Sequence, residues 1–406
     1  MKICFLVGSM KISGGTYVIV QHASYLKNSG HDVTLAIQEP FTQQTLEWHD
    51  EAPKLRCVPT SVAMQERFDL VIATWWKTAL ELGAYQADRF SYFVQSIESR
   101  FYPSAESPLK ALVDATYRLP VHYVTEATWI KTHLETNYGH QATLVRNGVR
   151  KDVYHAAGNA IEARPADSPR VLIEGHFGVK FKNTALAIRL AKKAGAKDIW
   201  LLTGSTVRWV PGVSRVFSQV PMVKTADIYR SCDILIKLST VEGMFGPPLE
   251  MFHCGGTAVV FNVTGHDEYI LDGKNALVAS IGDLGTVVDQ VATLLNDKET
   301  LQNLKKGALE TAKAWPSWND ASLQFAQWVD QVMLQPVTDQ TAVAGIVKTA
   351  FETYEKEEKS RLDKNPAITR RHKLSAMTAK FPKSFISKVK ALEAAGELIF
   401  GGNKVH

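Results

Sequence analysis

The stretch of residues 232–263 constrains the fold most, because two short apolar runs enclose a glycine-bearing loop and one helix-length segment. One run ends at Leu238 and the other begins at Ala258, and both have the length and composition of buried parallel strands. Pro247 can begin the helix, since proline is tolerated in a first helical turn, and the Gly-Gly pair at 255–256 ends it. This order predicts a βαβ unit, and therefore an α/β protein with a parallel sheet.

Two carboxylates, Glu242 and Glu250, flank the loop with seven residues between them. We expect Gly243, Gly246 and the first-turn amides of the helix to be free to donate to an oxygen-rich ligand. Carboxylates accept hydrogen bonds from sugar hydroxyls, and amides donate to sugar oxygens. The alternative is a helix with an acidic start after a glycine turn, with no ligand.

The alternation of strand-length apolar runs with helix-length segments extends over most of the chain. Further strand-length runs, separated by stretches with helical spacing, lie at 2–8, 32–37, 68–74, 90–95, 122–125, 170–174, 199–203 and 215–219. They predict two Rossmann-like domains, residues 1–155 and 169–335, joined by a linker rich in Ala, Gly and Pro at 156–168. The first βαβ unit has no G-x-G-x-x-G, so we do not expect a dinucleotide cofactor.

Charge and cysteine usage narrow the class of protein. The formal net charge is +5, but residues 341–406 carry 13 Lys and Arg against 7 Asp and Glu, while the rest of the chain carries 33 against 34. Four cysteines without close pairing indicate a reduced, cytoplasmic protein. There is no signal-peptide pattern and no apolar run of membrane-spanning length. We expect no nucleic-acid partner.

The Glu-x7-Glu spacing around Gly-Met-Phe-Gly-Pro resembles the donor-sugar motif of retaining GT-B glycosyltransferases, in particular glycosyltransferase family 4. The resemblance covers residues 1 to about 335. It implies a GT-B fold: an N-terminal acceptor domain, a C-terminal donor domain whose last helix crosses back, and a cleft between them. A helical extension at 341–406 would follow. It also implies a nucleotide-sugar donor, a glycan or lipid-linked glycan acceptor, and a place in bacterial surface polysaccharide synthesis.

The resemblance assigns donor-binding roles to a defined set of residues. A Gly-Gly loop would lie near the donor diphosphate, and Lys182, with Lys180 as the alternative, would grip it, although His176 stands where the family has Arg. Glu250 would bind the ribose hydroxyls, and Glu242 would face the donor sugar. The implied donor-binding residues are Gly14, Gly15, His176, Lys182, Glu242, Gly243, Met244, Phe245, Gly246 and Glu250.

The acceptor side is expected at the carboxyl end of the run 90–95, where ligand crevices of open α/β sheets lie. Gln95 and Glu98 stand there, in a segment similar to that of bacterial rhamnosyltransferase-like members of the family. Many other members have His here, and this chain does not. With Glu242 and Lys182, Gln95 completes the expected catalytic set. The alternative is that Gln95 and Glu98 only cap a loop.

Metal chemistry is not expected, since no two Asp stand at i,i+2 and no His/Cys cluster has metal-ligand spacing. Lysines and helix ends would neutralise the leaving nucleoside diphosphate instead, and no cofactor is expected. The resemblance implies retention of anomeric configuration, with the donor phosphate taking the acceptor proton. A GT-B nucleotide-sugar 2-epimerase, a non-catalytic GT-B partner subunit and a hydrolase with two catalytic carboxylates remain alternatives.

The tail has two parts. Val343, Ile346, Val347, Ala350, Phe351 and Tyr354 form one helical stripe, and Asn365-Pro366 ends that helix. Residues 366–400 mix Lys and Arg with apolar side chains, which favours binding to an anionic membrane surface at the inner face of the plasma membrane. The alternative is that these stripes dock on the protein itself or on a second copy in a homodimer.

Overall fold

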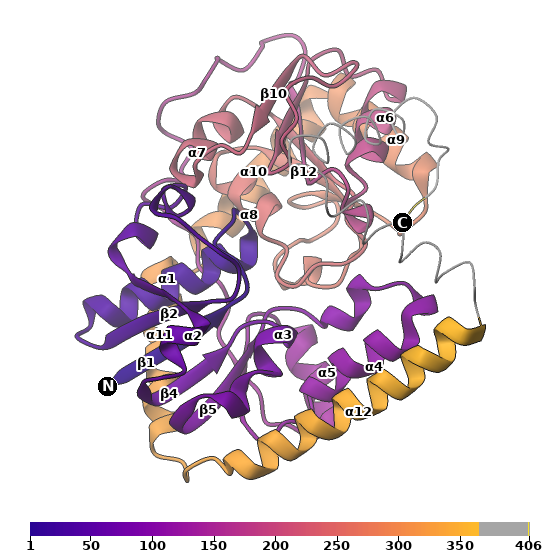
Figure 1. Cartoon of the computed structure of the whole chain (residues 1–406). Coiled ribbons are helices and arrows are strands. Elements are labelled where there is room, and N and C mark those ends of the chain that lie inside the picture. Colours follow the sequence, from indigo (N-terminus) through magenta and orange to yellow (C-terminus); the bar gives the residue numbers. More distant parts are fainter. Residues whose placement is uncertain (365–404, 406) are drawn as a thin grey trace. The chain divides into compact units, whose positions relative to one another are not determined.

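The computed structural model describes residues 1–364 and 405 (Figure 1). The chain forms two compact units. Among the described residues, the first comprises Met1–Asn147 and residues 319–364, and the second comprises Gly148–Trp318 and residue 405. Each is an α/β unit with its own parallel sheet and its own buried apolar core.

In the described part of the first unit, seven parallel strands form one sheet in the order β3-β2-β1-β4-β5-β6-β7. Their bounds are β1 (Lys2–Val7), β2 (Asp32–Ile37), β3 (Arg56–Pro59), β4 (Arg67–Ala73), β5 (Gln86–Val94), β6 (His122–Thr125) and β7 (Thr143–Leu144). The strand order reverses between β1 and β4, so ligand-binding loops are expected after these strands.

The helices of the first unit come from both ends of the chain. They are α1 (Gly14–Asn28), α2 (Thr60–Ala63), α3 (Trp76–Ala79), α4 (Ser107–Thr116), α5 (Thr128–Tyr138), α11 (Trp318–Met333) and α12 (Gln340–Lys364), with 3-10 turns η1 (Gln43–Leu46), η2 (Ala52–Lys54), η3 (Leu82–Ala84), η4 (Glu98–Phe101) and η5 (Ser104–Glu106). The buried ring of His22 on α1 stacks on Phe325 of α11 at 4.2 Å between centroids, and its Nδ1 lies 3.1 Å from Ser322 Oγ. Burial lowers the pKa of His22 to about 3, so this contact is neutral and structural.

The helix α12 lies along α4 of the same unit (Figure 1). Val343 is fully buried, and Ile346, Val347, Ala350 and Tyr354 pack against the core. The docking of this stripe on the protein itself is therefore confirmed, except for Phe351, which is 41% exposed.

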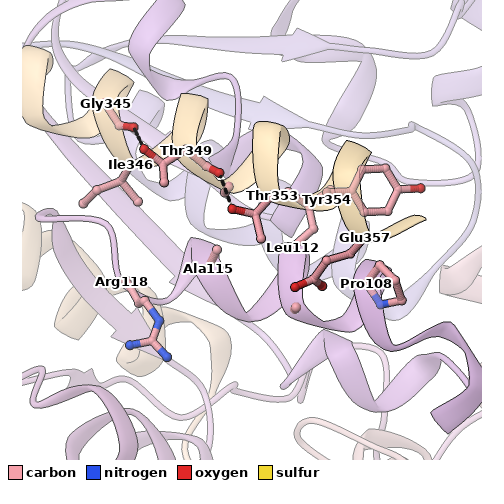
Figure 2. Close-up of a pocket in the computed structure, with 12 residues that line it drawn as sticks. Pro108, Leu112, Ala115, Arg118, Gly345, Ile346, Thr349, Thr353, Tyr354 and Glu357 are labelled. Carbon is pink, nitrogen blue, oxygen red and sulfur yellow. Dashed lines mark hydrogen bonds between the residues drawn. The ribbon is translucent and has the colours of Figure 1, made fainter. Parts of the chain in front are cut away.

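A groove of about 340 Å³ remains between α4 and α12. Figure 2 shows Ile346 and Ala115 on its walls, with Arg118 at the end of α4. The basic segment 366–400 lies outside the described residues, so its membrane binding stays a prediction.

In the described part of the second unit, six parallel strands form a sheet in the order β10-β9-β8-β11-β12-β13. The strands are β8 (Val171–Glu174), β9 (Ile199–Thr203), β10 (Arg215–Ser218), β11 (Ile234–Lys237), β12 (Thr257–Phe261) and β13 (Leu277–Ala279). The helices are α6 (Thr184–Lys193), α7 (Met222–Arg230), α8 (Gly246–His253), α9 (Leu284–Asn296) and α10 (Lys298–Ala314), with 3-10 turns η6 (Lys180–Lys182) and η7 (His266–Glu268). The strand order reverses between β8 and β11.

The chain passes from one unit to the other at Asn147–Gly148, earlier than the linker predicted at 156–168. At residue 148 the backbone already lies against the end of the second unit, because a Cβ on Gly148 would lie 2.3 Å from the carbonyl oxygen of Ser317. Beside it, the Trp318 amide donates to the Val149 carbonyl at 3.3 Å. The chain is thus already fixed within the second unit at residue 148. Among the described residues, no helix combines the length and apolarity needed to cross a membrane.

Candidate functional site

The loops that follow β8 and β11 form the site in the second unit. These strands are neighbours at the reversal of strand order, where open α/β sheets bind their ligands. The Thr240 amide donates to the Phe181 carbonyl at 2.9 Å, and Asn183 Nδ2 donates to the Leu238 carbonyl at 3.0 Å. Asn183 adopts the left-handed conformation (φ 49°) between η6 and α6. These bonds hold the two loops against each other.

The paired loops bring Lys182 and Glu242 into direct contact. Lys182 Nζ lies 2.7 Å from Glu242 Oε1 and 2.8 Å from Oε2, so it engages both oxygens of the carboxylate. The exposed fractions of the two side chains are 21% and 10%. Burial acts to raise the pKa of Glu242, but the charges of Lys182 and Lys237 outweigh it and hold that pKa below its usual value. Glu242 is therefore an ionised carboxylate in a largely buried ion pair.

Two further charged residues, Lys237 and Glu174, belong to this cluster and were missed from the sequence. They are the last residues of the adjacent strands β11 and β8, and their side chains form an ion pair. Lys237 is 2% exposed, and its Nζ lies 3.6 Å from Glu242 Oε1. Although burial opposes it, the charges of Glu174 and Glu242 raise the pKa of Lys237. The signal that was available is a lysine inside an otherwise apolar strand, because buried lysines are rare unless they are paired.

Glu250 projects from α8, and its pKa is shifted in the direction opposite to that of Glu242. Burial raises its pKa to about 7, against hydrogen bonds from Tyr229 and Tyr154 that lower it. The neighbouring charge of Glu174 adds to the rise. The pKa values of the two acids of the motif are thus shifted in opposite directions, downward for Glu242 and upward for Glu250.

His176 stands at the start of the loop after β8, with its ring against the backbone of Gly204. A Cβ on Gly204 would lie 2.2 Å from His176 Cε1, so a larger residue there would displace the ring. Burial lowers the pKa of His176, and the nearby charges of Lys182 and Lys237 act in the same direction. A neutral imidazole therefore stands where the resemblance implies a cationic arginine.

The expected set of free amides before α8 needs correction. The Gly246 amide donates to the Met244 carbonyl at 3.0 Å. Pro247 and Pro248 occupy the first turn of α8 and have no N–H group. This helix start therefore offers fewer backbone donors than predicted.

Three of the predicted residues lie in the first unit. Gly14 and Gly15 begin α1, whose cap Ser13 accepts from the Thr16 amide at 3.1 Å. The first amides of a helix have no partner within the helix. A Cβ on Gly15 would lie 3.2 Å from Gln95 Oε1, which is buried and has no hydrogen-bond partner in the described part of the chain. Gly15 and an unsatisfied Gln95 acceptor are therefore adjacent, next to the reversal of strand order in this sheet.

Glu98 does not join them. Its Oε2 accepts from the Trp76 amide at 2.8 Å and from the Tyr92 hydroxyl at 2.9 Å, and its own amide donates to the Tyr117 hydroxyl at 2.8 Å. Glu98 is 5% exposed, and burial raises its pKa to about 8. The contacts support the alternative in which Glu98 caps a loop. Over the described residues, no group of three or more His, Cys, Asp or Glu side chains could hold a metal ion.

The sequence matches a family model described as glycosyl transferases group 1 over residues 211–311, a range that contains Glu242 and Glu250. It is 25% identical over 233 residues to the O-antigen biosynthesis protein RfbC of Myxococcus xanthus, covering 54% of this chain and 18% of that protein. It is 23% identical over 198 residues to the uncharacterized glycosyltransferase MJ1178 of Methanocaldococcus jannaschii, covering 47% and 54%. The chain thus spans little more than half of one curated relative and less than a fifth of the other.

Solved structures resemble the fold of most of this chain. Sucrose-phosphate synthase from Thermosynechococcus elongatus has a TM-score of 0.65 at 15% identity, covering 82% of this chain and 99% of that one. Anabaena Alr3699/HepE in complex with UDP-glucose has a TM-score of 0.65 at 15% identity, covering 82% and 100%. WaaG, a glycosyltransferase involved in lipopolysaccharide biosynthesis, has a TM-score of 0.61 at 11% identity, covering 80% and 99%.

The fold is therefore GT-B, with two Rossmann-like domains, as the sequence predicted. The match to glycosyl transferases group 1 supports a glycosyltransferase within that fold.

Proposed function

We propose that this protein is a glycosyltransferase that moves a sugar from a nucleotide-sugar donor to a hydroxyl group of a glycan or lipid-linked glycan. One observation carries the proposal: the segment that matches the group 1 model contains both acids of the motif, and the fold sets Glu242 on Lys182 at the strand reversal. The names of RfbC and of the HepE complex with UDP-glucose favour polysaccharide synthesis from a nucleotide-sugar. A finer placement, in glycosyltransferase family 4 near rhamnosyltransferase-like members, belongs to the same proposal.

The chemistry follows from the charge that grows on the leaving nucleoside diphosphate. Lys182 would bind that diphosphate, with the Gly14 and Gly15 amides as further donors. Glu250 would accept hydrogen bonds from the ribose hydroxyls, and its pKa of about 7 allows this at neutral pH. Glu242 would face the donor sugar, and the unsatisfied oxygen of Gln95 would accept from the reacting partners.

We further propose that configuration is retained, with the donor phosphate taking the acceptor proton. No metal is needed in this scheme, because Lys182 would supply positive charge to the diphosphate. The reaction would take place in the cytoplasm, at the inner face of the plasma membrane if the acceptor is lipid-linked.

Three alternatives give different products. A nucleotide-sugar 2-epimerase would release free sugar without an acceptor, as would a hydrolase that uses Glu242 and Glu250 as its two acids. A non-catalytic GT-B subunit would yield no product. The ion pair of Glu242 with Lys182 favours ligand binding over hydrolysis, because the carboxylate is already engaged by an ammonium group.

The test begins with a thermal-shift screen of nucleotide-sugars, followed by transfer assays with the stabilising donor. We expect Lys182→Ala and Glu250→Ala each to lower the transfer rate at least tenfold, because each removes a group that holds the donor. Lys305→Ala is the matched control, since Lys305 forms a comparable buried pair with Asp233 in the same unit, at 2.8 Å. Wild-type rates in both site variants would refute the assignment.

The same assay tests the metal-free scheme. Transfer should continue in excess EDTA, since Lys182 would replace a divalent ion as the source of positive charge at the diphosphate. A complete loss of the chemical step that Mg²⁺ restores would contradict this expectation. Free sugar released without acceptor would instead point to the epimerase or hydrolase.

A further inference from the structure

Lys237 is the most buried charge of the candidate site, and the proposed chemistry gives it no direct contact with the donor. It belongs to a cluster of two lysines and two glutamates whose formal charges balance: Lys182, Lys237, Glu174 and Glu242. Since a charge this deeply buried is costly unless it is paired, its partners indicate what it does.

We propose that Lys237 is a positioning residue for Glu242. It keeps this carboxylate ionised and in place when Lys182 passes from Glu242 to the diphosphate of a bound nucleotide. The inference rests on the proposed function and deepens it, because it concerns the same site.

Lys182 is already occupied by Glu242. Its ammonium group lies 2.7 and 2.8 Å from the two oxygens of Glu242, so an entering diphosphate competes with a carboxylate for it. The side chain of Glu242 is only 10% exposed, so water cannot fully replace the lost partner. A carboxylate left alone in such a setting would be driven towards protonation.

Lys237 already stands next to Glu242, the carboxylate that Lys182 would leave. Its Nζ lies 3.6 Å from Glu242 Oε1, one of the two oxygens that Lys182 holds. A shift of less than 1 Å would bring this pair to hydrogen-bond distance. Glu242 can thus exchange one ammonium partner for another without moving into solvent.

Lys237 is more deeply enclosed than Lys182. Lys237 ends a strand within the sheet, and its ion pair with Glu174 joins the ends of two hydrogen-bonded strands. The ring of Phe245 lies 6.0 Å from its Nζ and covers it. Lys182 ends a short 3-10 turn and is ten times more exposed, at 21% against 2%. The lysine on the turn is therefore suited to follow the ligand, and the lysine on the strand to remain with Glu242.

The experiment measures binding of uridine diphosphate and of inorganic pyrophosphate by calorimetry, in a double-mutant cycle between Lys237 and Glu242. We expect Lys237→Met to weaken binding about tenfold in the wild-type background, because Glu242 then retains Lys182. In the Glu242→Gln background the same change should weaken binding less than threefold, because the carboxylate that Lys237 holds is absent. Lys237→Arg should keep most of the wild-type affinity.

The control is Lys305→Met, which removes a buried lysine paired with Asp233 in the same unit and should leave both affinities unchanged. Circular dichroism of each variant establishes that it is folded. Equal effects of Lys237→Met in both backgrounds, or no effect in either, would overturn the inference and leave the proposed function standing. If the wild-type protein binds neither ligand, the donor-site proposal fails as well.

Discussion

Glu98 and Glu242 are both carboxyl groups in loops that follow parallel strands, yet their surroundings give them opposite charges. Glu242 has two lysines within 4 Å, and they hold it ionised. Glu98 has neutral donors only, the Trp76 amide and the Tyr92 hydroxyl, and burial raises its pKa to about 8. The lysines beside Glu242 and the burial of Glu98 thus shift the pKa values of these two acids in opposite directions.

Glu98→Gln provides the pH-dependent prediction. The native state holds the Glu98 proton up to about pH 8, whereas an unfolded Glu releases it near its ordinary value of 4.5. Between these values the native state binds more protons, so the contribution of Glu98 to stability falls as pH rises towards 8. The Gln variant cannot ionise and can still accept both hydrogen bonds. We therefore expect its melting temperature, relative to wild type, to increase from pH 5 to pH 8.5.

Glu98→Ala is the contrasting variant, because it leaves the Trp76 amide and the Tyr92 hydroxyl without their acceptor. Each unpaired buried group costs about 1–3 kcal/mol, so this variant should melt lower at every pH. If the Gln and Ala variants melt alike, or if the Gln difference does not change with pH, Glu98 does not act as a protonated cap.

At the level of elements, α12 is a structural part of the first unit. The side chain of Val343 is fully buried in a core that otherwise comes from residues 4–142. Val343→Ala should destabilise the unit by about 1–3 kcal/mol, since it removes buried methyl groups and leaves a cavity. Val337→Ala is the matched control, because Val337 is 65% exposed and its change should stay within about 0.5 kcal/mol. Urea unfolding of the two variants makes the comparison, and equal values would show that α12 is not packed as described.

Several elements could be predicted from the sequence alone, whereas contacts between elements could not. The runs at 2–8, 32–37 and 199–203 correspond to β1, β2 and β9, because short apolar runs between glycines leave few alternatives. The sequence also shows that Pro247 and Pro248 have no N–H groups to donate at the start of α8. By contrast, the pairing of Lys237 with Glu174 depends on β8 lying beside β11, and local sequence patterns do not encode strand order. The sequence also does not determine what the apolar stripe of α12 packs against, because periodicity reveals an apolar face but not what covers it.

For the whole molecule, the unequal distribution of charge leads to a prediction about membranes. The basic segment 366–400, outside the described residues, should bind anionic vesicles with a strength that falls as salt rises. Co-sedimentation of the full chain with phosphatidylglycerol vesicles, at low and high salt, measures this. A chain ending at residue 365 is the control. Equal binding by both proteins, or no binding by the full chain at low salt, would contradict the prediction.

The ends of the second unit meet each other. The amide of Val149 donates to the Pro316 carbonyl at 3.2 Å, and the carbonyl of Val149 accepts from the Trp318 amide at 3.3 Å. In evolutionary terms this makes residues 148–318 a cassette, a contiguous stretch of coding sequence whose two junctions lie side by side in the folded chain. Such a stretch can be gained or exchanged in a single recombination event, because the junctions left in the host domain need little bridging. Exchange of residues 148–318 would leave the seven-stranded sheet of the first unit and its helix α12 unchanged in sequence.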